Sequence, residues 1–224
     1  FEYMAFPRLL AMSEVQWTQP EHKDFESFAR RLDKEFERLD YCGVNACRNF
    51  YEVNQTGAWN KSQQTYEVTL NTFCPDADIY YAVNDSTVNT SSSLYGTPIP
   101  LDEDATVYSA VYRDGKPLGK VTRKSFAVNK ATGCDYTCNP KAGWEHLNKG
   151  FGLTDGRRGY ARDMRRWISF YQDTVQIVVE LKKPQKVKEV AFSSLWRPVN
   201  EIWPARAMGV SVSMDGQTFI SGGH

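Results

Sequence analysis

The chain has 224 residues, of which 41% are hydrophobic, and it carries 27 acidic and 27 basic residues. A net charge of zero gives no field that would attract nucleic acid or an anionic membrane surface, so neither is an expected partner. The mean hydropathy of −0.54 and the lack of a long apolar run argue against a membrane span, and this length suits one large domain or two to three small ones.

Residues 1–17 predict an amphipathic helix that is already under way at the first residue. Its stripe at helical spacing comprises Phe6, Leu9, Leu10, Ser13 and Trp17. Such a stripe needs a hydrophobic partner, and no earlier part of this chain can supply one. We therefore expect the chain to be the C-terminal piece of a longer polypeptide.

A second helix is predicted between Asp24 and Gly43. Asp24 is a candidate N-cap, and Gly43 follows the last apolar residue of the pattern, where a left-handed C-cap is expected. Its apolar side chains recur at three- and four-residue steps: Phe25, Phe28, Leu32, Phe36 and Leu39. Charged residues cover its other faces. Two consecutive helices that face a missing partner suit the outer ring of a (β/α)8 barrel.

The strings in this region also resemble a known family. E-Y-M-A-F-P-R-L-L-A-M-S-E-V-Q-W-T, then D-F-x-x-F-x-x-R-L and R-L-D-x-x-G-V-N, are similar to the end of the catalytic barrel in glycoside hydrolase family 20, the β-N-acetylhexosaminidases. The resemblance implies that residues 1–45 are the last two barrel helices. It also implies hydrolysis of terminal N-acetylhexosamine, in which the substrate's own N-acetyl carbonyl is the nucleophile.

This resemblance implies an Asp-Glu pair at the end of a barrel strand, and the chain has none there. Its one Asp-Glu dipeptide, Asp102-Glu103, falls in a predicted loop. We therefore assign no catalytic residue to this chain and expect the catalytic groups upstream of it. Arg8 and Glu14 are expected to make ion pairs with neighbouring helices, although a site role is the alternative. No cofactor is expected.

Residues 46–130 predict an antiparallel β-sandwich. The period of the apolar pattern becomes two in segments around Tyr66–Leu70, Ile79–Val83, Thr106–Tyr112 and Lys120–Val128, and Asp114-Gly115 is a hairpin signal. The pattern from Ile79 to Gly115 (I-x-Y, a polar turn, S-x-x-Y, a proline, T-V-x-x-A and a glycine turn) resembles the chitobiase-type C-terminal domain.

Residues 131–141 read as a linker, and residues 142–224 as a third unit. Strands are expected at Val175–Leu181, Val187–Phe192 and Val210–Met214, the last followed by an Asp215-Gly216 turn. L-T-D-G, R-W, V-V-E-L-K-K-P and S-V-S-x-D-G-x-T-F are similar to part of a coagulation-factor 5/8 type C module. The resemblance implies a galactose-binding-like jelly roll, here truncated, with an exposed strand edge.

The third unit holds the candidate saccharide-binding residues. Aromatic rings and guanidinium groups recur together in it, and the candidates are Trp167, Trp196 and Trp203 with Arg166 and Arg197. Sugar rings stack on indole faces, and guanidinium groups donate hydrogen bonds to hydroxyls. The alternative is that these tryptophans fill the core. Asp155-Gly156 suits either a calcium site or a tight turn.

The five cysteines include two pairs that are close in sequence, Cys42/Cys47 and Cys134/Cys138. They are either disulfides of an exported protein or small buried thiols, and we prefer the thiols. With only three histidines, widely spread, no metal site is predicted.

The sequence thus predicts a mostly β, multidomain chain: two barrel helices, a β-sandwich and a partial jelly roll. The expected function is that of the C-terminal accessory part of an extracytoplasmic β-N-acetylhexosaminidase, with a glycan and the rest of the barrel as partners. The alternatives are a non-catalytic carbohydrate-binding or adhesion module and a structural spacer without a ligand.

Overall fold

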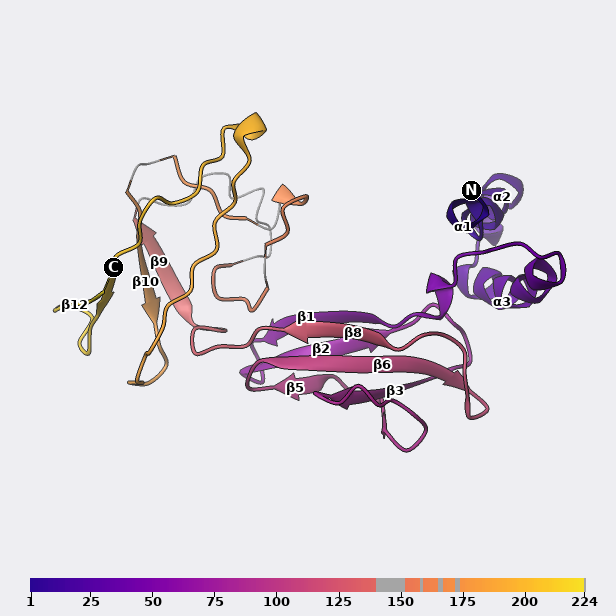
Figure 1. Cartoon of the computed structure of the whole chain (residues 1–224), viewed down its shortest axis with the longest axis horizontal. Coiled ribbons are helices and arrows are strands. Elements are labelled where there is room, and N and C mark those ends of the chain that lie inside the picture. Colours follow the sequence, from indigo (N-terminus) through magenta and orange to yellow (C-terminus); the bar gives the residue numbers. More distant parts are fainter. Residues whose placement is uncertain (140–151, 158, 165–166, 172–173, 224) are drawn as a thin grey trace. The chain divides into compact units, whose positions relative to one another are not determined.

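The computed structural model describes residues 1–139, 152–157, 159–164, 167–171 and 174–223 (Figure 1). The chain is mostly β, with antiparallel sheets and few helices, and it divides into two compact units. The first comprises Phe1–Gly57 and Glu67–Phe126, and the second comprises Ala58–Tyr66 and Ala127–His224.

The first unit opens with helical segments: α1 (Glu2–Ala5), α2 (Arg8–Trp17), the 3-10 turn η1 (Pro20–His22), α3 (Phe25–Tyr41) and the 3-10 turn η2 (Asn49–Tyr51). The single helix predicted for residues 1–17 is wrong in one respect, because it breaks at Phe6 and Pro7. Proline lacks an N–H and disfavours helical geometry in the residue before it, and Phe6 is extended with φ −101°.

Helix α3 confirms its predicted boundaries. The Asp24 carboxylate accepts hydrogen bonds from the backbone N–H groups of Glu26 and Ser27, at 2.9 and 3.3 Å. Gly43 follows the helix with φ 71°, the left-handed geometry that closes a helix C-terminus. Its buried face consists of Ala29, Leu32 and Phe36.

Two antiparallel sheets follow. One has the order β1-β2-β5, and the other has the order β4-β3-β6-β7, with β8 also paired to β6. The strands are β1 (Asn54–Asn60), β2 (Thr65–Asn71), β3 (Asp78–Val83), β4 (Ser93–Leu94), β5 (Ile99–Leu101), β6 (Ala105–Arg113), β7 (Lys116–Pro117) and β8 (Thr122–Phe126). The predicted antiparallel strands of this region are therefore confirmed.

Strand β6 is the centre of this domain, because it is buried on both faces. Val107, Ser109 and Val111 are fully buried on one face, where Ser109 accepts a hydrogen bond from Gln55 of β1 at 2.8 Å. On the other face Tyr112 donates to the carbonyl of Val88 at 3.0 Å, so the loop after β3 covers this side. Alternation along a strand separates these two sets.

The turn after β6 is the one that the Asp114-Gly115 pair predicts. Both residues have positive φ, 50° and 74°, and Arg113 pairs with Lys116 across a two-residue loop. These are the backbone angles of the hairpin turns whose twist matches that of the flanking strands.

The second unit contains two two-stranded sheets in its described part, one of β9 (Asp135–Asn139) with β10 (Gln176–Glu180) and one of β11 (Val210–Val212) with β12 (Ile220–Gly223). A short 3-10 turn, η4 (Pro198–Asn200), lies between them in sequence. Strand β9 falls in the stretch 131–141 that the sequence analysis reads as a linker. The jelly roll remains a prediction.

One predicted strand of this unit is wrong. Residues Val187–Phe192 include valine and phenylalanine, which are common in strands, but they form no strand. Val187, Val190 and Phe192 are exposed. Their apolar residues do not alternate regularly, and a strand is stable only beside a hydrogen-bonded neighbour.

The tip of the β1–β2 hairpin belongs to the second unit and is held there by three contacts. Lys182 lies over the Trp59 ring at 4.2 Å from its centre and donates to Gln64 at 2.6 Å. Tyr66 donates to the carbonyl of Gly156 at 3.2 Å. This hairpin tip therefore groups with the residues that follow Phe126.

Candidate functional site

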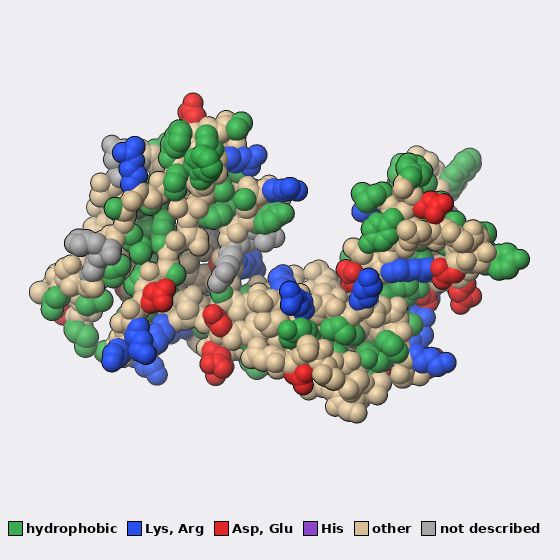
Figure 2. Space-filling model, in the orientation of Figure 1, with side chains coloured by type: hydrophobic (Ala, Val, Ile, Leu, Met, Phe, Trp, Pro, Cys, Tyr) green, Lys and Arg blue, Asp and Glu red, His purple; other side chains and the backbone are tan. Residues whose placement is uncertain are grey.

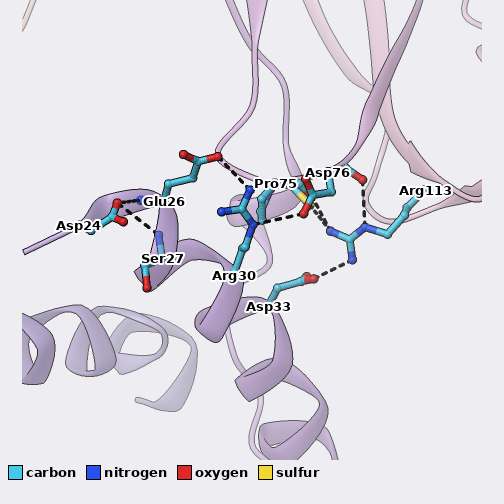
Figure 3. Close-up of polar contacts among 9 residues, drawn as sticks. Asp24, Glu26, Ser27, Arg30, Asp33, Pro75, Asp76 and Arg113 are labelled. Carbon is cyan, nitrogen blue, oxygen red and sulfur yellow. Dashed lines mark hydrogen bonds and ion pairs between the residues drawn. The ribbon is translucent and has the colours of Figure 1, made fainter.

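An ion-pair network joins α3 to the β-sandwich within the first unit (Figure 3). Arg113, at the end of β6, donates to the Asp33 carboxylate of α3 at 2.6 Å. The same guanidinium donates to the carbonyl of Pro75 at 2.8 Å and to the Cys74 sulfur at 3.1 Å. One residue thus holds a helix and the loop that joins β2 to β3.

Two further contacts complete this junction. The Tyr51 hydroxyl donates to the other oxygen of Asp33 at 2.8 Å. Arg30, one turn before Asp33, donates to the Asp76 carboxylate at 3.3 Å. We refer to Arg30, Asp33, Tyr51, Asp76 and Arg113 as the junction network. Because its central pair is partly buried, it is screened less than a surface ion pair.

Burial raises the pKa of two groups at this junction, one in the network and one that contacts Arg113. It raises the pKa of the Tyr51 hydroxyl, and the hydrogen bond to Asp33 raises it further. Burial also raises the pKa of the Cys74 thiol to about 11, with the charge of Arg113 opposing the shift. Both groups therefore stay protonated at neutral pH. The five cysteines of the chain are free thiols in the structure.

The first helices are tied to α3 in the same way. Glu14 of α2 forms a two-pronged ion pair with Arg31 of α3, with N–O distances of 2.8 and 3.0 Å. Arg8 donates to the carbonyl of Met4 at 2.7 Å. Glu14 thus has the structural role expected for it, an ion pair with the neighbouring helix.

The apolar stripe of residues 1–17 is left largely uncovered by this arrangement. None of the residues of α1 or α2 is buried, and Leu9 and Trp17 of the predicted stripe are exposed. Further exposed apolar side chains in this stretch are Phe1, Tyr3, Met4, Met12 and Val15. Figure 2 shows hydrophobic side chains gathered over these helices. The exposed apolar side chains of α1 and α2 thus form a patch that no other described part of the chain covers.

Of the predicted binding residues, Trp167 is half-buried in the second unit. Its indole N–H donates to the carbonyl of Tyr160 at 3.1 Å, and a Cβ on Gly159 would meet its ring at 2.4 Å. The Trp167 indole thus packs against the backbone of the second unit with part of its surface still exposed. Arg166 lies outside the described residues.

The other three predicted residues come together in one tight hairpin. Arg197 and Ile202 form an antiparallel bridge with two backbone hydrogen bonds, of 2.9 and 3.2 Å. Between them lie η4 and Glu201, which adopts the left-handed conformation with φ 57°. Trp196 and Trp203 flank this bridge, and both are about two-thirds exposed, at 67% and 69%. We call residues 196–203 the tryptophan hairpin.

The Asp155-Gly156 pair forms a tight turn. The Asp155 carboxylate accepts backbone hydrogen bonds from Gly152 at 3.0 Å and from Arg157 at 2.9 Å, and Gly156 has φ 73°. Both carboxylate oxygens are thereby occupied. In the part of the chain that the structure describes, no group of three or more His, Cys, Asp or Glu side chains could hold a metal ion.

Asp102 and Glu103 lie in the exposed loop between β5 and β6, as expected. Within the described ranges, no helix has the length and apolar character needed to cross a membrane.

The strands of the sandwich match a known protein family. Residues 55–123 match the chitobiase/beta-hexosaminidase C-terminal domain. The matched stretch runs from β1 to β8, so it contains both sheets of the sandwich and the Arg113 end of the junction network. The sandwich is thus similar to the chitobiase-type C-terminal domain that the pattern from Ile79 to Gly115 resembles.

The chain is also similar to a beta-hexosaminidase of Porphyromonas gingivalis, with 51% identity over 45 residues. This match covers 20% of the chain and 6% of that relative's length. The similarity relates the chain to a glycosidase over a short stretch only.

Sequence reasoning missed the junction network. Asp33 and Arg113 are 80 positions apart, and nothing in the chain marks them as partners. The one available signal was the position of Asp33 directly after Leu32, at the border of the apolar stripe of α3. A carboxylate at such a border faces whatever packs against the helix.

Proposed function

We propose that this chain is the C-terminal accessory part of a β-N-acetylhexosaminidase. The observation that carries the proposal is the match of residues 55–123 to the C-terminal domain of chitobiases and beta-hexosaminidases. The beta-hexosaminidase relative supports it, and so does the order of the resemblances along the chain: barrel helices, then sandwich.

In this proposal the helices of residues 1–45 complete the outer layer of a catalytic barrel. Their exposed apolar side chains are the surface that the remainder of the barrel covers. The catalytic groups belong to that remainder, which removes terminal N-acetylhexosamine from glycans by substrate-assisted hydrolysis.

The role of the sandwich is then to support the barrel through α3. The junction network connects β6 to this helix by a partly buried ion pair. In this proposal the ion pair keeps the sandwich attached to the barrel helices. An accessory domain attached in this way stabilises the enzyme without contributing a reacting group.

Hydrolysis of a chromogenic N-acetyl-β-glucosaminide by the complete polypeptide that contains these residues tests the proposal. We expect release of the chromophore by the complete polypeptide and none by residues 1–224 alone. A complete, folded polypeptide that hydrolyses neither this substrate nor the matching galactosaminide would contradict it and favour a non-catalytic carbohydrate-binding or adhesion module.

We also infer an extracytoplasmic location, since an enzyme that trims glycans meets them outside the cytoplasm. Cell fractionation with an antibody against the sandwich checks this inference. Recovery in the cytoplasmic fraction would overturn it.

A further inference from the structure

The tryptophan hairpin places two indole rings on one face by its backbone register. Arg197 pairs with Ile202 in an isolated antiparallel bridge, and Trp196 and Trp203 are the next residues outward on the two arms of the hairpin. Because side chains alternate along extended chain, we infer that Trp196 and Trp203 share the face opposite to that of Arg197 and Ile202. The burial agrees: both tryptophans are exposed, whereas Arg197 and Ile202 are half-buried.

Backbone hydrogen bonds and one buried neighbour hold the tryptophan hairpin in place. Two backbone hydrogen bonds close it, and Leu195, next to Trp196, is buried and anchors it to the unit. Figure 2 shows hydrophobic side chains around the η4 turn, at the top of the second unit in that view. A closed backbone hairpin that carries two exposed indole rings binds a ligand with less loss of backbone freedom than an open loop would.

From this geometry we propose that the tryptophan hairpin is a binding site for a glycan chain that contains N-acetylhexosamine. The C–H faces of pyranose rings pack on the two indole faces, and each indole N–H is a hydrogen-bond donor for a hydroxyl. Val199, 92% exposed at the tip, offers an apolar contact for the methyl group of an acetamide. The choice of N-acetylhexosamine rests on the proposed function.

The charges of the hairpin favour an uncharged ligand over an anionic lipid surface. Glu201 is exposed at the tip, between the two tryptophans in sequence, and the Arg197 side chain is half-buried on the opposite face. A membrane that took up the two indoles would bring the Glu201 carboxylate against its headgroups. Neutral sugar hydroxyls instead accept from or donate to Asn200 and Glu201, both exposed.

Affinity electrophoresis of the 224-residue chain in gels containing soluble glycol chitin tests the site, with a fluorescence titration by chitohexaose for the dissociation constant. We expect the wild-type chain to be retarded. Trp196→Ala and Trp203→Ala should each weaken binding by about tenfold, which corresponds to the loss of one aromatic contact, and the double variant should migrate as in a gel without saccharide.

Two controls separate this site from a general effect of the substitutions. Trp17→Ala removes an equally exposed tryptophan, at 86%, from the first unit and should leave the retardation unchanged. Trp203→Tyr keeps an aromatic platform and should retain most of the binding. Far-UV circular dichroism establishes that each variant is folded.

Several results would overturn the proposal: a wild-type chain that neither glycol chitin nor chitohexaose engages, equal retardation of wild type and double variant, or binding to phosphatidylserine vesicles in place of saccharide. Because no hydrolysis is measured, failure here leaves the hexosaminidase proposal standing. Retention of saccharide by a complete polypeptide without hydrolytic activity would support this site and reject that proposal.

Discussion

Arg113 is the residue that connects the parts of the first unit at the junction network. It donates to Asp33, to the Pro75 carbonyl and to the Cys74 sulfur, and so connects a helix, a loop and a strand. Removal of one partner of a partly buried ion pair leaves the other charge poorly solvated.

We therefore expect Arg113→Met to lower the free energy of unfolding by about 2–3 kcal/mol, measured by urea denaturation of the chain. Arg38→Met is the matched control. Arg38 and Glu35 both lie on α3, and their ion pair is exposed. It should change the stability by less than about 0.5 kcal/mol. Equal effects of the two substitutions would show that the junction network does not stabilise the unit.

The buried Cys74 thiol gives the first unit a dependence on alkaline pH. Its folded-state pKa of about 11 exceeds its ordinary value of 9.0. Between these values the unfolded chain loses a proton that the folded chain keeps, so its contribution to stability is complete below pH 9 and is lost as the pH rises toward 11. Tyr51, with its raised pKa, acts in the same direction at higher pH.

Cys74→Ala should accordingly make stability less dependent on pH between about 9 and 11, as followed by urea midpoints across this range. Cys42→Ala, at an exposed cysteine, should leave the slope as it is in the wild type. An unchanged slope for Cys74→Ala would mean that this thiol titrates normally in the folded chain.

At the scale of elements, local chemistry predicts structure where the signal and the packing agree. The cap of helix α3 at Asp24 and its closing glycine at Gly43 were readable from the sequence. Of its predicted apolar stripe, Leu32 and Phe36 are buried, whereas Phe25 is exposed. The Asp114-Gly115 turn likewise fixes the start and direction of its hairpin because few residue pairs adopt positive φ at both positions.

Elements that depend on a distant partner were not predictable in this way. Strand β9 exists because β10 pairs with it, with Val178 opposite Thr137, whereas Val187–Phe192 has apolar residues and no strand beside it. The junction network could not be predicted for the same reason, because its residues are far apart in the sequence and meet only in the folded unit. The face shared by Trp196 and Trp203 follows from a bridge that the residue types alone did not reveal.

The tryptophan hairpin depends on one residue in the left-handed conformation. Glu201 has φ 57°, which a β-branched side chain adopts only with strain. We expect Glu201→Val to destabilise the hairpin by about 1–3 kcal/mol and to weaken chitohexaose binding, whereas Glu201→Gly should keep the turn. Loss of binding in both variants would instead assign the effect to the carboxylate, and equal binding by both would show that the turn does not position the rings.

At the scale of the whole molecule, each unit has a separate task in this account. Under the proposed function, the first unit attaches the sandwich to helices whose exposed side chains the rest of a barrel would cover, and the second unit presents two exposed indole rings. The attachment is the central claim, because it makes the sandwich a working part of a hydrolase and not a neighbour on the same chain.

Heat inactivation of N-acetyl-β-glucosaminide hydrolysis by the complete polypeptide tests this claim most directly. Arg113→Met should keep the turnover number at low temperature, because the proposed function places the catalytic groups outside this chain. It should lose activity at a temperature about 4–8 °C below that of the wild type and of Arg38→Met. Inactivation of all three proteins at the same temperature would contradict the account, because the sandwich could then loosen from α3 without consequence for the enzyme.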